Sequence, residues 1–521
     1  MAEHDALVIG GGHNGLVLAN YLAKAGLKTL VLESRLEIGG GLATEELTIP
    51  GFQHNYSYFH DTINIMPTYR DLGLDDCNAR YRRPQVQAGL PLKDGRALTF
   101  WSDIDRTCES IARFSERDSK TYREVQENYL EFMEAVVVPA LYSPPQLPSM
   151  QMKVLEATPE GLEYLRMSRM SPQAVVDELF ENEHVKALIL HHLPIPRGML
   201  HDYHGLGFVI PRVISQVEHS QICVGGSHLL AHALWRALVR NGGAVKAPFK
   251  VARILIEDGR AIGVESVQGE RIYANKLVAS SIGFKQTFAD LIGEEHLEAD
   301  LLNKVKHFKL DEFSIFIVHL ALKEPPIHKT ANGYGDVNQA FRLDIGLETP
   351  EDFEILFGEI RRGELPQHLG MICSIPTLFD PGQAPEGKHT AFLWQMVPYK
   401  LRSGSWSEVK KEYMEQCLSK WREYAPNLTD DNIIMKVALT PEDIEAKFSN
   451  MAGGGLFMGR LTFDQLEYFR PLPELSQYRT PIGNLYLCGA CTHPGGGILG
   501  ATGFIAANVI ADDLALNKWW E

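Results

Sequence analysis

The start of the chain alternates apolar runs with polar or glycine-rich breaks, and this pattern predicts a strand, a turn, a helix and a second strand. Residues 6–9 form a short apolar run, which is typical of a buried parallel strand. Residues 10–15 read Gly-Gly-Gly-His-Asn-Gly, and apolar side chains then recur at helical spacing over residues 16–23. A second apolar run at 30–32 ends on Glu33. We therefore expect a strand–turn–helix–strand unit here.

The Gly-x-Gly-x-x-Gly spacing in this unit is what a backbone turn around a pyrophosphate requires. Gly10 permits the tight turn, Gly12 lets the backbone approach the phosphates, and Gly15 allows the helix to pack closely on the strand. The following helix N-terminus supplies unpaired N–H groups and a positive dipole end. Glu33 is placed to accept hydrogen bonds from ribose hydroxyls. The predicted cofactor contacts from this unit are Gly10, Gly12, His13, Asn14, Gly15 and Glu33.

A second glycine cluster favours FAD over NAD as the cofactor. After Glu33 come Ser34 and Arg35, followed by three glycines at 39–41. An arginine and a glycine cluster suit a further stretch of backbone wrapped around a long cofactor, which NAD sites do not usually need. We expect cofactor contacts at Ser34, Arg35, Gly40, Gly41 and Leu42.

The C-terminal part of the chain predicts a return to the same site. Residues 484–488 read as a buried strand, and a glycine-rich loop leads to residues 498–510, which are compatible with a helix. Such a helix end, placed near a flavin, would stabilise negative charge at the N1–C2 carbonyl edge of the reduced ring. Gly489, Gly497 and Ile498 are the predicted contacts.

Two cysteines in this loop allow a second interpretation. Cys488 and Cys491 form a Cys-x-x-Cys pair, which suggests thioredoxin-like redox chemistry. The pair follows a strand end and lies in a glycine loop, not at the N-terminus of a helix in a thioredoxin-like unit. The alternative, which we favour, is two small residues that pack near the cofactor.

The middle of the chain predicts a further segment of the nucleotide-binding part. Ser227 is a candidate N-cap for a helix that ends at Gly242 and Gly243. Two strands near residues 251–256 and 261–267 follow, joined by an Asp-Gly dipeptide that favours a hairpin. Helices are also expected at residues 121–140 and 171–190.

Taken together, these motifs resemble the phytoene desaturase-like FAD-dependent oxidoreductases. That family includes carotenoid desaturases, isomerases and ketolases and retinol saturase, and the chain is most similar to pyridine nucleotide-disulphide oxidoreductase domain-containing protein 2 and the desaturase-type β-carotene ketolases. The shared pieces are residues 10–16, Pro50-Gly51-Phe52, Asp464-Gln465, Arg470-Pro471, residues 478–481, Leu487-Cys488-Gly489 and residues 493–497.

The resemblance implies an α/β fold: a Rossmann-type FAD-binding domain, like those of glutathione reductase and amine oxidases, with an interleaved α+β substrate domain. In the family, the strand before the hairpin places a backbone group at the adenine, which carries over to Val251. The expected FAD-binding domain is discontinuous and comprises residues 1–90, 220–290 and 470–521. The expected substrate domain comprises residues 91–219 and 291–469.

The resemblance also suggests candidates for catalysis. The segment after Phe52 passes close to the flavin ring in the family, and here it ends in His60 and Asp61. Both could orient a substrate or move a proton, and histidine suits that task near neutral pH. An ordinary hydrogen-bonded loop is the alternative interpretation. Among the catalytic candidates, His60 is the first choice.

Only one dinucleotide fingerprint is present, because residues 453–459 carry Met458 where the pattern requires glycine. We therefore expect no separate NAD(P) domain. The predicted activity is oxidation or desaturation of a hydrophobic substrate, isoprenoid-like or aromatic, by hydride transfer to flavin N5, with oxygen or a quinone as electron acceptor. The alternatives are a flavin-dependent alkene isomerase or saturase, and a low-turnover FAD-containing regulatory or interaction protein.

Composition narrows the partners. The net charge of −16 argues against nucleic acid as a partner. Seven scattered cysteines do not read as a disulfide framework, which favours a reducing, cytoplasmic setting. No targeting segment is expected, and the apolar stretch at 313–322 is too short to span a bilayer. Trp519 and Trp520 leave peripheral membrane contact open, and a homodimer is also compatible with the sequence.

A group of histidines raises the question of a metal. His191, His192, His201 and His204 lie close together in the sequence. Two prolines between them break any regular ligand spacing, and no cysteine accompanies them. We therefore expect no metal, and a loop or an interface instead.

Overall fold

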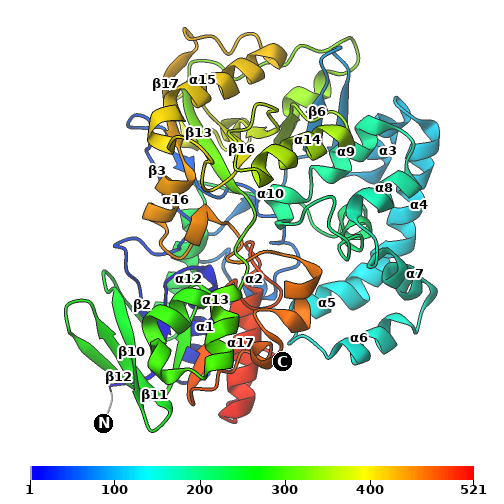
Figure 1. Ribbon diagram of the computed structural model, residues 1–521. Coiled ribbons are helices and arrows are strands. Elements are labelled where there is room, and N and C mark those ends of the chain that lie inside the picture. Colours follow the sequence, from blue (N-terminus) through cyan, green and yellow to red (C-terminus); the bar gives the residue numbers. More distant parts are fainter. Residues whose placement is uncertain (1–2) are drawn as a thin grey trace.

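The computed structural model describes residues 3–521, which form two large sheets and a group of helices (Figure 1). The first sheet has seven strands in the order β10-β11-β12-β1-β2-β9, with β18 paired to β12. Its strands are β1 (His4–Ile9), β2 (Thr29–Leu32), β9 (Ala244–Lys246), β10 (Val251–Glu257), β11 (Arg260–Ser266), β12 (Arg271–Ser280) and β18 (Leu485–Leu487).

The centre of this sheet is parallel and buried. β1 pairs in parallel with β2 on one side and with β12 on the other, and residues 6–9 of β1 are at most 3% exposed. Helix α1 (His13–Lys24) packs against α12 (His228–Arg240) and α17 (Ala501–Asp513) (Figure 1). Because neighbours cover α1 on several sides, residues 14–23 are all buried. The predicted strand–turn–helix–strand unit is confirmed.

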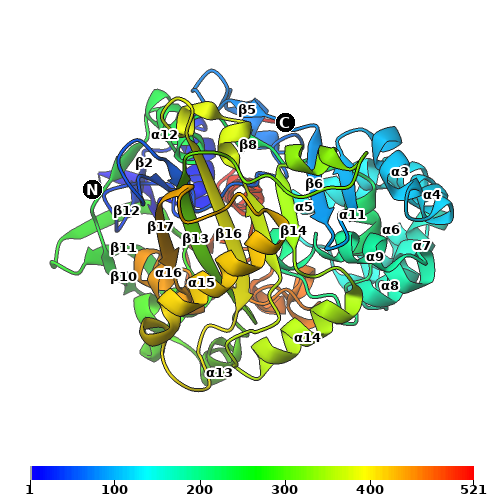
Figure 2. The same ribbon diagram turned by 90° about the horizontal axis from the view of Figure 1, so that it is seen from above.

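The second sheet also has seven strands, in the order β17-β13-β16-β15-β14-β6-β7. Figure 2 shows its long strands side by side, with the helices of residues 104–214 gathered beyond one edge. Its strands are β6 (Val86–Pro91), β7 (Ala97–Trp101), β13 (Ser314–Leu322), β14 (Arg342–Ile345), β15 (Met371–Ser374), β16 (His389–Val397) and β17 (Ile433–Leu439).

Strand β13 is buried on both faces, and its alternating side chains serve two different cores. Phe316 and Val318 pack with residues of α15 (Trp406–Tyr424), whereas Ile315 and Ile317 belong to the core shared with the helical part. The apolar run predicted to be too short for a bilayer is therefore a central strand. No helix among residues 3–521 is long and apolar enough to cross a membrane.

The remaining elements connect and cover the two sheets. The first group forms the helical part between β7 and β8: α3 (Ile104–Ala112), α4 (Glu116–Phe132), a π-helix (Met133–Val137), α5 (Val138–Leu141), α6 (Pro148–Leu155), α7 (Pro159–Met167), α8 (Pro172–Leu179), α9 (Glu183–Leu190), α10 (Pro194–Arg197) and α11 (Val209–Ile214). The others are β3 (Thr44–Glu45), β4 (His54–Asn55), α2 (Pro67–Asp71), β5 (Tyr81–Arg82), β8 (Ile222–Cys223), α13 (Ala299–His307), α14 (Pro350–Arg361) and α16 (Pro441–Lys447). The predicted domain limits stay a prediction; β6, which begins before residue 90, pairs with β14 and β7 of the second sheet.

Two helix predictions are wrong in detail. The helix expected over 171–190 is divided into α8 and α9, because Phe180 is extended and the side chain of Asn182 accepts hydrogen bonds from the first N–H groups of α9. Ser227 does not cap α12: its backbone is helical, and its hydroxyl donates to the carbonyl of Ser57. A side-chain cap is a local competition that tertiary partners decide.

The hairpin prediction is confirmed. β10 and β11 pair in an antiparallel manner and are joined by Asp258 and Gly259, which have φ angles of 49° and 72°. Positive φ at both central residues is what a type I′ turn requires, and Asp-Gly favours it.

Arg470 ties the C-terminal loop to the loop that precedes it. Its side chain is fully buried and donates hydrogen bonds to the carbonyls of Phe457, Gly459, Arg460, Gln465 and Ala490. Burial lowers the pKa of the guanidinium to about 10, so the group remains charged at neutral pH. One side chain thus satisfies acceptors on two separate stretches of the chain.

We predict that Arg470→Met destabilises the protein strongly. Several buried carbonyls would lose their donor, and each such loss costs about 1–3 kcal/mol. The free energy of unfolding should fall by about 3 kcal/mol or more, measured by urea denaturation. Arg402→Met, at a side chain that is 71% exposed, is the matched control and should change stability little. Equal stability of the two variants would contradict this role for Arg470.

Candidate functional site: a dinucleotide turn that opens on an apolar cavity

The first turn has the geometry that its glycines predict. Gly10 has a φ of +95°, in the left-handed region that favours glycine. A Cβ on Gly15 would lie 2.2 Å from the carbonyl oxygen of Gly10, so no side chain fits there. A Cβ on Gly12, in contrast, would meet no described atom within 4 Å. Gly15 is needed for packing inside the protein, whereas Gly12 borders open space.

The helix that follows this turn presents free N–H groups. Gly12 is the N-cap of α1, and no side chain accepts a hydrogen bond from the first turn of the helix. Unpaired N–H groups at a helix N-terminus, with the positive end of the helix dipole behind them, bind phosphate oxygens. The turn therefore fits the pyrophosphate of a dinucleotide.

Glu33 holds the turn together at the end of β2. Its Oε2 accepts a hydrogen bond from the N–H of Gly11 at 2.7 Å, and its Oε1 accepts from the N–H of Arg35 at 2.8 Å and the hydroxyl of Ser34 at 3.1 Å. Each carboxylate oxygen has two lone pairs, so Oε2 retains one acceptor position for a ribose hydroxyl. Glu33 and Ser34 thus fit the roles that the sequence predicts for them.

The second glycine cluster lies directly against the first. The N–H of Gly39 donates to the carbonyl of Gly11 at 2.8 Å, and a Cβ on Gly40 would lie 3.3 Å from the Cα of Gly12. The guanidinium of Arg35 lies near Glu37 and Glu45 and 5.0 Å from the ring of Phe448. The loop therefore brings a second stretch of backbone to the phosphate-binding turn.

The C-terminal loop meets the N-terminal turn from the other side. A Cβ on Gly489 would lie 2.5 Å from the carbonyl oxygen of Ser281, at the end of β12. Nε2 of His13 is 3.0 Å from the carbonyl oxygen of Gly497, and the hydroxyl of Thr62 donates to the carbonyl of Ile498 at 2.7 Å. Segments more than 400 residues apart in the chain therefore form one site.

One continuous cavity joins these loops to the second sheet and the helical part. Eight of the predicted cofactor contacts line it: Gly12, His13, Asn14, Gly40, Gly41, Leu42, Gly497 and Ile498. The others lie behind this lining or, as Val251 does, at the beginning of β10: Gly10, Gly15, Glu33, Ser34, Arg35, Val251 and Gly489. Beyond the glycine loops, much of the wall is apolar, with Phe59, Ile195, Met199, Ile315, Ile317, Trp394, Phe448 and Phe457.

His60 and Asp61, adjacent in sequence, have different surroundings. His60 is fully buried, does not line the cavity, and has its Nδ1 2.8 Å from the hydroxyl of Tyr81. Burial lowers the pKa of His60 to about 3, so the ring is neutral. Asp61 lines the cavity, and its Oδ1 accepts a hydrogen bond from the hydroxyl of Ser220. Burial raises the pKa of the Asp61 carboxyl.

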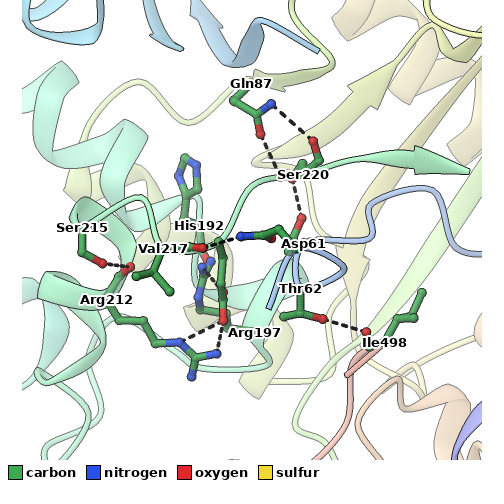
Figure 3. A network of polar contacts seen from close by, with 12 residues as sticks. Asp61, Thr62, Gln87, His192, Arg197, Arg212, Ser215, Val217, Ser220 and Ile498 are labelled. Carbon is green, nitrogen blue, oxygen red and sulfur yellow. Dashed lines mark hydrogen bonds and ion pairs between the residues drawn. The ribbon is translucent and has the colours of Figure 1, made fainter. Parts of the chain in front are cut away.

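Sequence reasoning did not find a charged cluster in the cavity wall. Arg197, at the end of α10, and Arg212, on α11, both form ion pairs with Glu218 (Figure 3). All three side chains line the cavity and are 4–13% exposed. One signal could have revealed Arg212: it is a single charge within the apolar sequence of residues 208–214.

The other candidates from the sequence have structural partners. Cys488 and Cys491 are buried, and burial raises the pKa of the Cys491 thiol to about 11, which favours the thiol over the reactive thiolate. Trp519 and Trp520 pack on the ring of Tyr21, with ring centres 5.2 and 5.0 Å away. Within residues 3–521, no group of three or more histidine, cysteine, aspartate or glutamate side chains has a geometry that could hold a metal.

Comparison with known proteins identifies the relatives of the chain. A family model described as an NAD(P)-binding Rossmann-like domain matches residues 8–72. One of the polypeptides of the limonene dehydrogenase of Castellaniella defragrans is 34% identical, over 99% of this chain and 96% of its own length. Pyridine nucleotide-disulfide oxidoreductase domain-containing protein 2 of Rattus norvegicus is 32% identical, over 98% and 94%. A lycopene-forming phytoene desaturase of a Paracoccus species is 25% identical, over 99% and 98%.

The chain belongs to the phytoene desaturase-like family of FAD-dependent oxidoreductases. It is an enzyme with FAD as its cofactor, as the sequence predicts. Solved structures agree with the fold of this flavoprotein. An oxidoreductase from Methanosarcina mazei has a TM-score of 0.63 at 18% identity, covering 98% of this chain and all of its own. A redesigned putrescine oxidase has a TM-score of 0.63 at 13% identity, covering 98% and 99%. The predicted α/β, amine oxidase-like fold is confirmed.

We predict that two glycine substitutions in the turn separate cofactor binding from folding. Gly12→Ala should keep the stability of the apoprotein but lower the FAD content of the purified protein, because its Cβ would project into open space beside the phosphate-binding turn. Gly15→Ala should lower both, since its Cβ would collide with the backbone of Gly10. The measurements are flavin absorbance per protein and the thermal unfolding midpoint. Gly335→Ala, where a Cβ also meets nothing within 4 Å, is the control, and full FAD content in Gly12→Ala would contradict the assignment.

We predict that the flavoprotein loses stability as the pH falls from 6.5 to about 4. Burial lowers the folded-state pKa of His13 to about 4 and of His60 to about 3, below the ordinary value of 6.5. The unfolded chain therefore binds protons first, and each such histidine contributes up to about 1.4 kcal/mol per pH unit. Urea midpoints at saturating FAD should fall between pH 6.5 and 4. His60→Gln should flatten this slope, the exposed His204→Gln should not, and equal slopes would show that His60 does not contribute.

Proposed function

We propose that this flavoprotein oxidises or desaturates a hydrophobic substrate, isoprenoid-like or aromatic, and passes the electrons to oxygen or a quinone. The observation that carries the proposal is the continuity of one cavity from the glycine loops at Gly12 and Gly497 into a largely apolar wall. Ligand sites are commonly concave and apolar, with a few convergent polar groups. A hydrophobic molecule in this cavity would lie next to the cofactor loops.

The origin of the wall supports a substrate that is held away from water. Ile315 and Ile317 come from β13, Trp394 from β16 and Ile195 from α10, so two sheet strands and the helical part enclose the same space. The names of two relatives, limonene dehydrogenase and phytoene desaturase, refer to hydrophobic molecules and support the same substrate class. Exclusion of water favours hydride transfer over competing reactions.

FAD supplies the redox chemistry when bound, because its N5 atom accepts a hydride. The chain itself binds the phosphates at the N-terminus of α1, orients the substrate against the apolar wall and holds a proton. Asp61 is the group we assign to the proton: it lines the cavity, its Oδ1 accepts from Ser220, and burial raises the pKa of its carboxyl. His60, hydrogen-bonded to Tyr81 outside the cavity lining, would support the position of this segment.

We predict that one class of hydrophobic compound bleaches the flavin anaerobically. The purified holoprotein would be mixed without oxygen with matched alcohols, alkenes, aldehydes and isoprenoids, and the flavin absorbance followed. Fast bleaching by one compound, with recovery and peroxide on admitting air, would establish an oxidase; bleaching that only a quinone reverses would establish a dehydrogenase. Turnover only after reduction with dithionite would point to the isomerase or saturase instead. Neither bleaching nor turnover would contradict the proposal and favour the low-turnover regulatory protein.

Asp61→Asn tests the assigned proton carrier with the bleaching substrate. The rate of flavin reduction should fall about 10²–10⁴-fold, with the FAD content unchanged, because the amide cannot accept the proton. His60→Gln should have a smaller effect, and the exposed Asp76→Asn should have none. A larger loss in His60→Gln than in Asp61→Asn would reverse the two roles.

A further inference from the structure

The charged cluster in the cavity wall contains more positive than negative groups. Oε2 of Glu218 accepts a hydrogen bond from Arg197 at 2.8 Å, and its Oε1 accepts from Nε of Arg212 at 3.2 Å (Figure 3). The two arginines lower the pKa of Glu218, so this carboxylate is ionised. Two guanidinium groups therefore share one carboxylate at a site that is shielded from water.

The neighbouring charges leave this imbalance in place. Arg342 is paired with Asp344 at 3.0 Å, and burial together with Arg342 lowers the pKa of His192, so that ring is neutral. Arg197 donates to the backbone carbonyl of His192, not to a second anion. Asp61 accepts from the hydroxyl of Ser220 and forms no ion pair within the described chain. The cluster thus retains one positive charge without a partner.

The cavity wall also has spare hydrogen-bond donors. Among the described residues that line the cavity, the buried side-chain atoms without a partner are Nε of Arg197 and Nε1 of Trp394, and both are donors. Arg212 uses its Nε and one terminal nitrogen on Glu218, and its Nη1 has no acceptor among residues 3–521. A ligand that satisfies this wall must bring acceptor atoms and negative charge.

We propose that Arg197 and Arg212 bind the carboxylate head of a substrate whose apolar body fills the rest of the cavity. Arginine pairs with carboxylates through two parallel hydrogen bonds, and charge-assisted bonds of this kind are the strong ones in proteins. A pure hydrocarbon would leave the extra guanidinium buried without an anion, which is costly. This inference rests on the proposed function, because it assumes that the same cavity holds the substrate.

The test measures dissociation constants of matched ligands for the holoenzyme. Three carbon skeletons would be used, linear octyl, phenylpropyl and monoterpenoid, each as carboxylate, primary amide and alcohol. Binding is followed anaerobically through tryptophan fluorescence, since Trp394 lines the cavity. In at least one skeleton the carboxylate should bind about tenfold or more tightly than its amide. Equal binding of acid and amide in all three skeletons would overturn the proposal.

Variants give the preference a sign as well as a size. Arg212→Gln and Arg197→Gln should each remove the preference for the carboxylate and leave amide binding unchanged. Glu218→Gln should strengthen carboxylate binding, because it removes the anion that competes for both arginines. Arg402→Gln, on the exposed surface, is the control and should behave as the parent. A preference that survives both arginine variants, at normal FAD content, would also overturn the proposal; if neither variant folds, the direction of the Glu218→Gln change decides.

The outcome separates this inference from the proposed function. If acids bind preferentially but no compound reduces the flavin, the carboxylate site stands and the oxidation proposal fails. If a neutral compound bleaches the flavin and acids show no preference, the oxidation proposal stands and the carboxylate site fails.

Discussion

The close approach of backbone to backbone at the start of α1 is the constraint on which the rest of this flavoprotein depends. Gly15 lies so near the carbonyl of Gly10 that a Cβ would collide with it at 2.2 Å, and Gly503 lies equally near the carbonyl of Asn14. The first contact places the N-terminus of α1 at the end of β1, and the second places α17 on α1. Because both contacts exclude a side chain, the two ends of the chain meet at one fixed point, where the N–H groups of α1 and the carbonyl of Gly497 border the same cavity.

The second sheet supplies the other half of the site by a different device. Strand β13 is buried on both faces, so its alternating side chains anchor α15 on one side and form the cavity wall on the other. Arg470 then links the loops at Gly459 and Ala490 by hydrogen bonds to their carbonyls. A rigid wall and a fixed loop on opposite sides of the cavity preserve the distance between cofactor and substrate, on which hydride transfer depends.

The charged cluster in this largely apolar wall is costly for folding, and the cost indicates a role in binding. Burial of several ions is commonly no more stabilising than apolar residues of the same volume would be. Arg197, Arg212 and Glu218 satisfy one another only in part, since a guanidinium nitrogen of Arg197 has no acceptor among residues 3–521. Incomplete satisfaction of a polar network at a cavity is typical of a site that a ligand completes.

The sequence by itself determined the features that act locally. The glycine spacing at residues 10–15, the acid at the end of β2 and the Asp-Gly hairpin at 258–259 depend on backbone conformation, and they suffice for the Rossmann-type turn, FAD and the family. The tertiary structure decided whatever depends on direction and distance. It places Asp61 in the cavity lining and His60 behind it, because adjacent side chains in a segment packed on both sides have different neighbours. It brings Glu218 to Arg197 across 21 positions of sequence, and it divides residues 171–190 into two helices. No local pattern contains such contacts, because they arise only when separate elements pack.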